Sequence, residues 1–308
     1  MKELKQPKKT VRDIIAWHFG DKDGKPEIER LSGGITNQVF CVRAKKHSYI
    51  VRLGADAGKI NDFLKEQWAI AKAREGGVPA PEVLEVSVEA APVPYMISRQ
   101  SKGTEATYHA GRSAILREMG RFAAIINAIP TAGFGATFEW SLNRLSHNTT
   151  WAAYLENELE LEKNLETLGS AGMLDPSRIR KLRTTLEGAS RNDRPPALNH
   201  GDMRLKNVLV DEKGRIACIL DWEHCTSNLA PEWELALALH DLSIDEKQDF
   251  LEGYGLTGKQ ISGISPVLKA MAIINYAPAV RHALHAKKED KIEWYRVRLA
   301  GELDLYSL

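Results

Sequence analysis

Apolar and polar positions change their spacing close to residue 100, so the two parts of the chain predict different structures. In the first part, short apolar runs alternate with polar residues, as at 39–42 and 49–53, which is typical of strands. Helical spacing is confined there to 10–20 and about 60–76. Two further strand-like segments lie at 82–88 and 95–98. This pattern predicts a small sheet with one main helix packed on it.

Beyond this point the apolar positions recur at helical spacing. The predicted helices are 114–129, 151–168, 176–190, 233–242, 245–253, 257–285 and 292–305. Two apolar runs between 208 and 219 flank a turn with a glycine, which predicts a β-hairpin. We therefore expect an α+β fold. A β-rich lobe would cover 1–98, with 1–24 as an N-terminal helix extension, and a mostly helical lobe would cover 99–308.

The composition limits the partners and the location that we expect. Lys and Arg total 42 against 41 Asp and Glu, so the net charge of +1 gives no general reason to bind nucleic acid or a membrane surface. The cysteines Cys41, Cys218 and Cys225 lack the spacing of a metal site. The N-terminus is unlike a signal peptide, and no segment approaches the length of a membrane span. We expect a cytoplasmic protein, either a monomer or a small homo-oligomer.

One motif carries most of the chemical information. The segment His200-Gly-Asp-Met-Arg-Leu-Lys-Asn207 is followed, across the predicted hairpin, by Ile219-Leu-Asp-Trp-Glu223. The hairpin would place Asn207 and Asp221 side by side near Asp202. A carboxylate at 202 can accept a hydroxyl proton, and the other two side chains can hold Mg²⁺, as phosphoryl transfer from a nucleotide requires. The alternative, a structural turn capped by Asp202, is less favoured because a second carboxylate follows at a fitting distance.

The motif and its context resemble the aminoglycoside phosphotransferases and related small-molecule kinases of the protein-kinase-like fold. The supporting segments are Leu31-Ser-Gly-Gly-Ile-Thr-Asn37, Tyr49-Ile-Val-Arg-Leu53 and Thr131-Ala-Gly-Phe-Gly135. The last of these, followed by Thr150-Trp151, and the strand ending at Arg99 are similar to antibiotic-phosphorylating members, hygromycin phosphotransferases among them. The resemblance covers about residues 28–255. It implies two lobes, a small antiparallel sheet with one main helix and a larger helical lobe that carries the catalytic hairpin.

The resemblance also implies ATP as the nucleotide, with GTP not excluded, and Mg²⁺ as the metal. Asp202 would be the base, and Asn207 and Asp221 the metal ligands. The nucleotide-binding residues would be Ser32, Gly33, Gly34, Arg52, Glu66, and Met96, Ile97 and Ser98, the last three through the backbone of a connector between the lobes.

Arg52 departs from the family pattern, which has a lysine on this strand. A guanidinium can hold phosphate oxygens in a bidentate manner and pair with Glu66. The alternatives are that Arg52 points outward and that Lys45 or Lys46 lies nearer the nucleotide.

Two supporting residues and several acids complete the predicted site. His200 would hold the loop by hydrogen bonding, and Glu234 takes the position of an aspartate that braces this loop in relatives, which leaves its geometry open. The acids expected on the acceptor side are Glu156, Glu160, Glu223 and Glu232. A cationic sugar favours such carboxylates, although a solvated acidic helix face explains them equally well.

The sequence therefore predicts an ATP- and Mg²⁺-dependent phosphotransferase for a hydroxyl of a small molecule, an aminoglycoside or amino-sugar compound first of all. One alternative is a metabolic kinase for choline, ethanolamine, homoserine or a sugar. Another is a non-catalytic nucleotide-binding protein of the same fold. The complete set of Asp202, Asn207 and Asp221 argues against the last of these.

Overall fold

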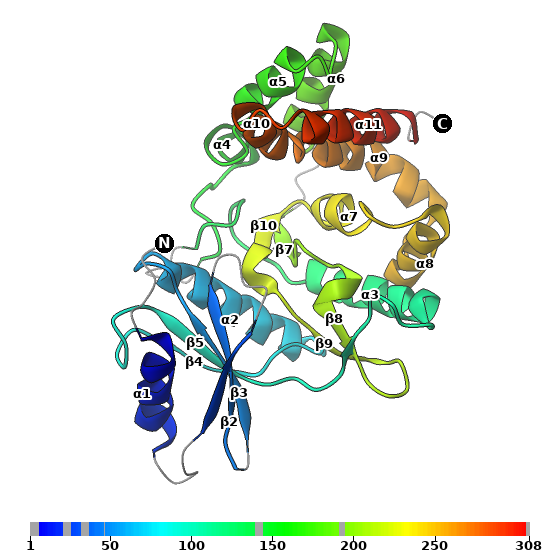
Figure 1. Cartoon of the computed structure of the whole chain (residues 1–308). Coiled ribbons are helices and arrows are strands. Elements are labelled where there is room, and N and C mark those ends of the chain that lie inside the picture. The colour runs from blue at the N-terminus through cyan, green and yellow to red at the C-terminus, as the bar shows by residue number, and fades with distance from the viewer. Residues whose placement is uncertain are drawn as a thin grey trace. The chain divides into compact units, whose positions relative to one another are not determined.

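The computed structural model describes residues 6–20, 26–31, 37–45, 47–138, 144–190 and 195–305, and it divides into two compact units (Figure 1). Unit 1 comprises Met1–Ile115, Thr137–Asn143 and Arg204–Cys225, and unit 2 comprises Leu116–Ala136, Arg144–Met203 and Thr226–Leu308. Residues Arg204–Cys225 thus belong to the same compact unit as the N-terminal sheet. The functional division at residue 98 stays a prediction.

Unit 1 is built on a five-stranded antiparallel sheet in the order β1-β2-β3-β5-β4. Its strands are β1 (Glu27–Arg30), β2 (Gln38–Arg43), β3 (Ser48–Leu53), β4 (Val83–Ser87) and β5 (Tyr95–Arg99). Successive side chains of a strand point to opposite faces. Tyr49, Val51 and Leu53 are accordingly buried in a core with helix α1 (Pro7–Phe19). The alternation in the sequence therefore predicted these strands correctly.

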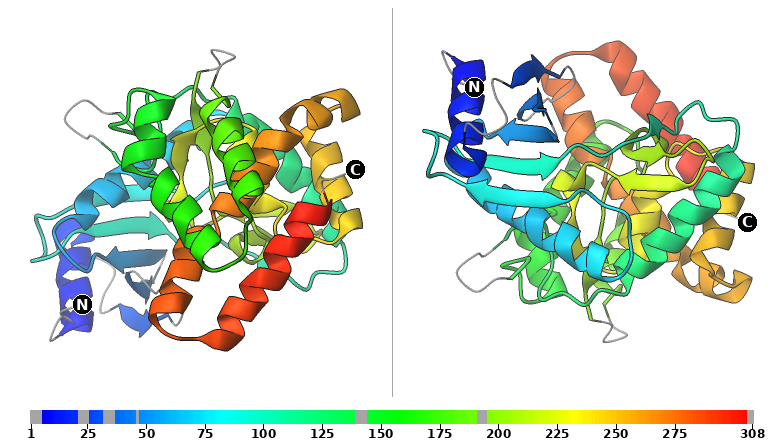
Figure 2. Two further views of the ribbon diagram at one scale, coloured as in Figure 1. Left: turned by 90° about the horizontal axis from the view of Figure 1, so that it is seen from above. Right: turned by 90° about the horizontal axis from the view of Figure 1, so that it is seen from below.

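The other face of the sheet meets helix α2 (Lys59–Glu75), which contacts β4 and β5 (Figure 2). Arg52 lies between Val51 and Leu53 on β3, so its side chain points away from the α1 core. It reaches Glu66 on α2 instead. Helices α1 and α2 thus cover opposite faces of one sheet, and Arg52 and Glu66 lie on the α2 side.

A second, three-stranded sheet in unit 1 contains the predicted hairpin. Its strands, in the order β6-β8-β9, are β6 (Thr104–Glu105), β8 (Val208–Val210) and β9 (Ile216–Ile219). The 3-10 helix η3 (Leu205–Asn207) precedes β8, and the 3-10 helix η4 (Trp222–His224) closely follows β9. The hairpin prediction is confirmed, and β6 is a partner strand that the pattern did not predict.

Unit 2 is mainly helical. It holds most of α3 (Arg112–Asn127), and α4 (Trp151–Asn157), α5 (Leu161–Ser170), α6 (Pro176–Glu187), α7 (Glu232–Ala238), α8 (Ile244–Tyr254), α9 (Gly258–Ile274), α10 (Ala277–His285) and α11 (Glu289–Leu305). A short pair of strands, β7 (Ala197–Asn199) and β10 (Thr226–Asn228), was not predicted from the sequence. Three-residue strands are too short to show an alternating pattern, so only the fold reveals them.

The single helices predicted over 151–168 and 257–285 are wrong, because each is two helices. Glu160 has a left-handed backbone with φ 48°, which no helix can contain, and the side chain of Asn164 donates to the carbonyl of Leu159 at 2.6 Å where α4 has ended. Pro278 lies in the first turn of α10, where its missing N–H costs no hydrogen bond.

Gly258–His285 is the helical run within the described residues that is long and apolar enough to cross a membrane, with a mean hydropathy of 1.2. This differs from the expectation that no segment approaches such a span. Half of its apolar 18-residue stretch is buried inside the protein, as in the core helix of a soluble protein, so the run is weak evidence for a membrane segment.

Helices α3 and α8 of unit 2 approach each other through two glycines. A Cβ on Gly120 would lie 2.0 Å from the Phe250 carbonyl oxygen, and one on Gly253 would lie 1.9 Å from the Arg117 carbonyl oxygen. Neither position can hold a larger residue without moving a helix. Nearby, Tyr254 at the end of α8 donates to Asn127 of α3 at 2.8 Å, which fixes the same crossing.

Candidate active site

The open end of the β8–β9 hairpin brings Asn207 and Asp221 together, as predicted. Val208 pairs with Ile219, and the backbone N–H of Leu220 donates to the carbonyl of Asn207 at 2.7 Å. Asp221 has a left-handed backbone, φ 65°, which is unusual for a residue with a side chain and turns the chain into η4. This pairing places an amide and a carboxylate at one edge of the unit.

The chemistry of these donors fits Mg²⁺, because oxygen ligands suit a hard cation that retains water and binds phosphate oxygens. Among the described residues, no three His, Cys, Asp or Glu side chains cluster as a metal site. A site that is complete by itself, as for structural zinc, is therefore not present in that part of the chain. Asn207 and Asp221 suit a metal that arrives with a nucleotide.

A buried ion pair lies on the α2 side of the sheet. Arg52 Nη1 and Glu66 Oε2 are 2.5 Å apart, and the guanidinium also lies over the ring of Phe63 at 5.3 Å from its centre. Burial lowers the pKa of Arg52, but Glu66 more than offsets it, so the net change in the pKa is upward. Burial raises the pKa of the Glu66 carboxyl, and Arg52 opposes this. Arg52 therefore points inward and stays protonated.

Glu223, one of the acids predicted on the acceptor side, lies in unit 1 beside this pair. One carboxylate oxygen is 3.4 Å from Arg52 Nη2 and 3.4 Å from the donating Nδ2 of Asn37. Asn37 was not singled out in the sequence, although it ends the glycine-rich segment. Arg52 is therefore surrounded by Glu66 and Glu223, both of which favour its charged form.

The other predicted nucleotide-binding residues fall into two groups. Ser32, Gly33 and Gly34 lie outside the described residues. Met96, Ile97 and Ser98 lie inside β5, which has β3 on one side and β4 on the other. The expectation that 96–99 form a connector is corrected by this, because their backbone belongs to a central strand. Any role in nucleotide binding stays a prediction.

The loop around Asp202 in unit 2 is held by Glu234 of α7. One Glu234 carboxylate oxygen accepts the backbone N–H of His200 at 2.5 Å and that of Gly201 at 3.3 Å. The backbone N–H of Glu234 in turn donates to the side-chain oxygen of Asn199 at 3.0 Å. The longer carboxylate thus reaches the loop, and Asn199, which directly precedes the motif, is a further support that sequence reasoning missed.

Burial dominates the electrostatics of this loop. It raises the pKa of Glu234 to about 7, although the two backbone donors pull the pKa down, and the nearby Asp202 adds to the rise. Asp202 itself is buried, with an exposed fraction of 6%, and its backbone N–H donates to His200 Nδ1 at 3.2 Å. His200 therefore makes a loop-stabilising hydrogen bond of the kind expected from the sequence.

The remaining acceptor-side acids differ in their surroundings. Glu156 is exposed on α4. Glu160 is already paired with Lys163 at 2.6 Å and with Arg281 at 3.2 Å, and the Lys163 hydrogen bond is the main cause of its lowered pKa. Glu232 is buried in the first turn of α7. These acids do not behave as one exposed acidic surface.

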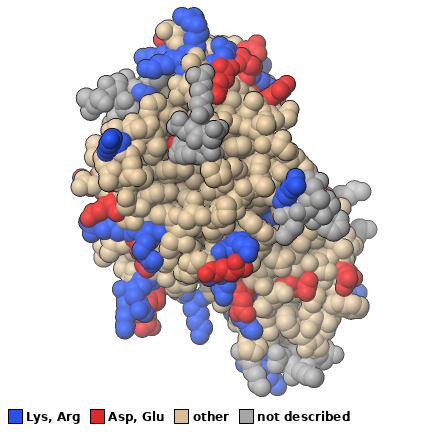
Figure 3. Space-filling model, turned by 180° about the vertical axis from the view of Figure 1, so that it is seen from behind, with Lys and Arg blue, Asp and Glu red and all other residues tan. Residues whose placement is uncertain are grey.

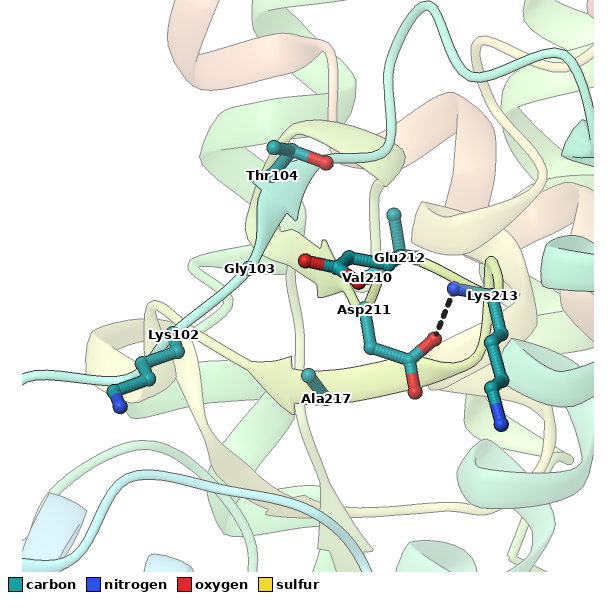
Figure 4. Close-up of a pocket in the computed structure, with 8 residues that line it drawn as sticks. All are labelled: Lys102, Gly103, Thr104, Val210, Asp211, Glu212, Lys213 and Ala217. Atoms are coloured by element: carbon teal, nitrogen blue, oxygen red, sulfur yellow. Dashed lines mark hydrogen bonds between the residues drawn. The ribbon is translucent and has the colours of Figure 1, made fainter.

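A separate cavity of about 550 Å³ opens at the turn end of the hairpin (Figure 4). Its lining residues are Lys102, Gly103, Thr104, Val210, Asp211, Glu212, Lys213 and Ala217. Asp211 accepts the backbone N–H of Lys213 at 2.9 Å and pairs with Arg215 at 2.7 Å. Since Asn207 and Asp221 lie at the opposite end of the strands, this cavity is distinct from the site expected at those two residues.

Comparison with solved structures shows the fold. A mutant of the aminoglycoside phosphotransferase APH(4)-Ia, in a ternary complex with AMP-PNP and hygromycin B, aligns with a TM-score of 0.66 at 20% identity over 95% of this chain and 97% of that chain. The GDP and kanamycin complex of APH(2")-IIia aligns with a TM-score of 0.64 at 16% identity over 97% and 98%. The protein thus has the protein-kinase-like fold, which confirms the predicted fold class.

The chain belongs to the phosphotransferase enzyme family, whose sequence profile matches residues 27–264. This match confirms the resemblance that the motif indicated. A curated relative, the hygromycin-B 4-O-kinase of Escherichia coli, is 22% identical over 230 residues, which is 71% of this chain and 64% of that protein. The match spans less than two thirds of that relative.

Proposed function

We propose that this protein transfers the γ-phosphoryl group of ATP, with Mg²⁺, to a hydroxyl of an aminoglycoside or related amino-sugar compound. The observation that carries the proposal is the pairing of Asn207 with Asp221 by the hairpin, five residues along the chain from Asp202. The two solved relatives described above were crystallised with nucleotides and aminoglycosides, which supports the same substrate classes here.

Each residue has a role in the proposed reaction. Asp202 orients the acceptor hydroxyl and takes its proton as the oxygen attacks phosphorus. Glu234 and His200 keep the Asp202 loop in place through the hydrogen bonds described above. Positioning of this kind is the main contribution that a protein makes to phosphoryl transfer.

We assign the phosphate side of the site to Arg52. Arg52, held by Glu66, donates to phosphate oxygens and offsets their charge. Asn207 and Asp221 would hold Mg²⁺, which when bound neutralises charge on the β- and γ-phosphates. ATP is the first nucleotide to test, and GTP the second, because one solved relative is a GDP complex.

The acceptor is the least constrained part of the proposal. An aminoglycoside carries several ammonium groups, which would favour carboxylates such as Glu156 and Glu232. On the face shown in Figure 3, the described Lys and Arg side chains are interspersed with Asp and Glu, in line with the net charge of +1. Recognition would therefore depend on short-range contacts near the loop rather than on a long-range field.

The proposal is tested by ADP release, coupled to an optical readout, with a panel of acceptors and with either ATP or GTP. Hygromycin B, kanamycin and related compounds form one arm; choline, ethanolamine, homoserine and free sugars form the other. Acceptor-dependent turnover with the antibiotics, absent in Asp202→Ala, supports the proposal. Turnover with the small metabolites alone would contradict the aminoglycoside part.

A metabolic small-molecule kinase is a second candidate, and the pairing of Glu160 favours it. Lys163 and Arg281 both neutralise Glu160, which leaves fewer free carboxylates for a polycation than the sequence suggested. A non-catalytic role remains a third reading. It would require nucleotide binding in a thermal shift assay together with no acceptor-dependent turnover for any acceptor.

We also propose a cytoplasmic protein that needs neither a nucleic acid nor a membrane partner and acts as a monomer or a small homo-oligomer. The near-neutral charge supports the absence of a nucleic-acid partner. Cell fractionation tests the location, and sedimentation analysis tests the oligomeric state.

A further inference from the structure

Lys65 is a buried lysine that the proposed mechanism does not use. Only 3% of this residue is exposed, although it lies on α2 beside Glu66. Its ammonium nitrogen donates to the backbone carbonyl of Glu223 at a distance of 2.8 Å. A buried ammonium group is costly unless such hydrogen bonds compensate for lost water, so this contact has a structural purpose.

The acceptor of this bond lies in the turn that follows Asp221. One residue, Trp222, separates Asp221, with its left-handed φ of 65°, from Glu223, and η4 begins at Trp222. The indole of Trp222 donates to the carbonyl of Ile219 at 2.9 Å and holds the start of the turn. Lys65 holds its other end, so the two bonds together hold the turn that begins at Asp221.

Lys65 and Glu66 connect α2 to two different parts of the site. Adjacent residues of an α-helix project about 100° apart, so one can reach β3 while the other reaches η4. Glu66 bonds to Arg52 at 2.5 Å, and Lys65 bonds to Glu223 at 2.8 Å. The carboxylate of Glu223 approaches Arg52 at 3.4 Å, which closes a ring of four residues.

The charge of Lys65 also acts on groups around it. Burial raises the pKa of the Cys225 thiol to about 12, and Lys65 acts in the opposite direction. It opposes the burial of Glu66 in the same way, after Arg52. These effects agree with the hydrogen bond that places the ammonium at the Glu223 carbonyl.

We propose that Lys65 is a positioning residue that fixes the turn after Asp221 against α2 and thereby determines the affinity for the magnesium–nucleotide complex. The proposal rests on the proposed function in one respect, the metal-binding role of Asp221. Through the pair Lys65-Glu66, one helix then sets both the phosphate-binding Arg52 and the metal-binding turn.

The test compares Lys65→Met with Lys72→Met, a matched change on the same helix at a lysine that is 41% exposed. Isothermal titration calorimetry measures ADP affinity in Mg²⁺ and in EDTA. We expect the Mg²⁺-dependent gain in affinity to fall at least about 10-fold in Lys65→Met, because residues that support metal ligands without binding the metal usually change metal affinity by this factor. Affinity in EDTA should change less than about twofold by the same reasoning. Lys72→Met should behave as the wild type, and Lys65→Arg should restore part of the gain.

Hydrogen exchange on Lys65→Gln gives a second readout that does not depend on metal. Amides of residues 221–225 should exchange faster than in the wild type, whereas those of β3 should not change. An unaltered Mg²⁺ gain in a folded Lys65→Met would overturn the proposal, as would equal losses in Mg²⁺ and EDTA. If no Lys65 variant folds, Lys65 supports the whole unit and the proposal is wrong. If Mg²⁺ does not raise the ADP affinity of the wild type, the proposed metal-binding role of Asp221 is wrong. The exchange result would then still decide whether Lys65 positions the turn.

Discussion

The two units hold their chemical groups in opposite ways. In unit 1, charged side chains are held by other charged side chains: Arg52 is bound by Glu66 and approached by Glu223. In unit 2, the loop of Asp202 is held through its own backbone, because Glu234 accepts the N–H groups of His200 and Gly201. A group that binds phosphate must stay charged, whereas a proton acceptor must above all be held in position.

This difference has consequences for substitution. Removing one partner of a buried ion pair strongly destabilises the folded protein, since the other charge is left without compensation. A loop braced through its backbone tolerates a change of side-chain charge better, provided that an acceptor atom remains. Variants that change the charge or shape of a side chain in one unit at a time, and measurements at different pH, therefore test whether the two units differ in this way.

The largest effect is expected from the two carboxylates of the motif. Asp202→Ala should lower kcat about 10³-fold, within the range for loss of a general base, and leave the affinity for Mg·ADP within about threefold. Asp221→Ala should abolish the Mg²⁺-dependent part of that affinity as well. Steady-state kinetics and calorimetry measure the two. Equal binding defects in both variants would contradict the separation of roles between the units.

The next effect concerns the buried pair. Arg52→Met should leave Glu66 without its partner and cost about 3 kcal/mol of unfolding free energy, together with a large loss of nucleotide affinity. Arg52→Lys keeps the charge but loses the fork geometry, so we expect a smaller loss. Urea unfolding and nucleotide titration provide the measurement. The pair is unimportant if Arg52→Met is as stable as the wild type.

A pH-dependent effect is expected from Glu234. Burial raises its pKa to about 7 in the folded protein, so the folded state keeps a proton that the unfolded state loses near its ordinary pKa of about 4.3. The resulting stabilisation is complete below pH 4 and is lost as pH rises through 7, by up to about 3 kcal/mol.

Glu234→Gln cannot ionise, yet its amide oxygen can still accept the two backbone N–H groups. The variant should therefore gain stability relative to the wild type between pH 5 and pH 8, as measured by urea unfolding at both values. All other groups titrate in both proteins, so they cancel in the difference. If the unfolding free energy of the two proteins changes by the same amount between pH 5 and pH 8, Glu234 does not change its ionisation on unfolding.

The smallest effect is expected from an exposed ion pair in unit 2. Arg183 binds Glu162 through two nitrogens at 2.7 and 2.6 Å, but both side chains are in contact with solvent. Arg183→Met should change the unfolding free energy by less than about 1 kcal/mol, because water already stabilises both charges. A loss as large as that of Arg52→Met would remove the distinction between buried and exposed pairs.

Sequence reasoning worked best where one local pattern determines the structure. The apolar runs around a turn predicted the hairpin that joins Asn207 to Asp221, and alternation predicted β2 and β3. The pairing of Arg52 with Glu66 was also predicted, but from the resemblance to the kinase family and not from the local pattern. Functional roles for these residues stay predictions.

It worked least well where distant segments decide or where the apolar spacing carries no signal. The break after α4 was missed although its causes are local, because neither the left-handed backbone of Glu160 nor the bond from Asn164 to the Leu159 carbonyl changes the apolar spacing. The support from Asn199 depends on α7, more than 30 residues away. The sequence did not indicate that the Glu223 carboxylate approaches Arg52, and the acceptor-side role expected for Glu223 stays a prediction.

The crossing of α3 and α8 has a further consequence for how this protein tolerates mutation. At Gly120 and Gly253 one helix backbone touches the other, so no rotamer exists that could relieve a larger residue. Elsewhere in a helical core, a neighbour can repack around a substitution. When a library of variants is selected for folded protein, glycine should therefore be retained at both positions almost without exception. Replacing α8 by the corresponding helix of a related protein would require α3 to be replaced with it.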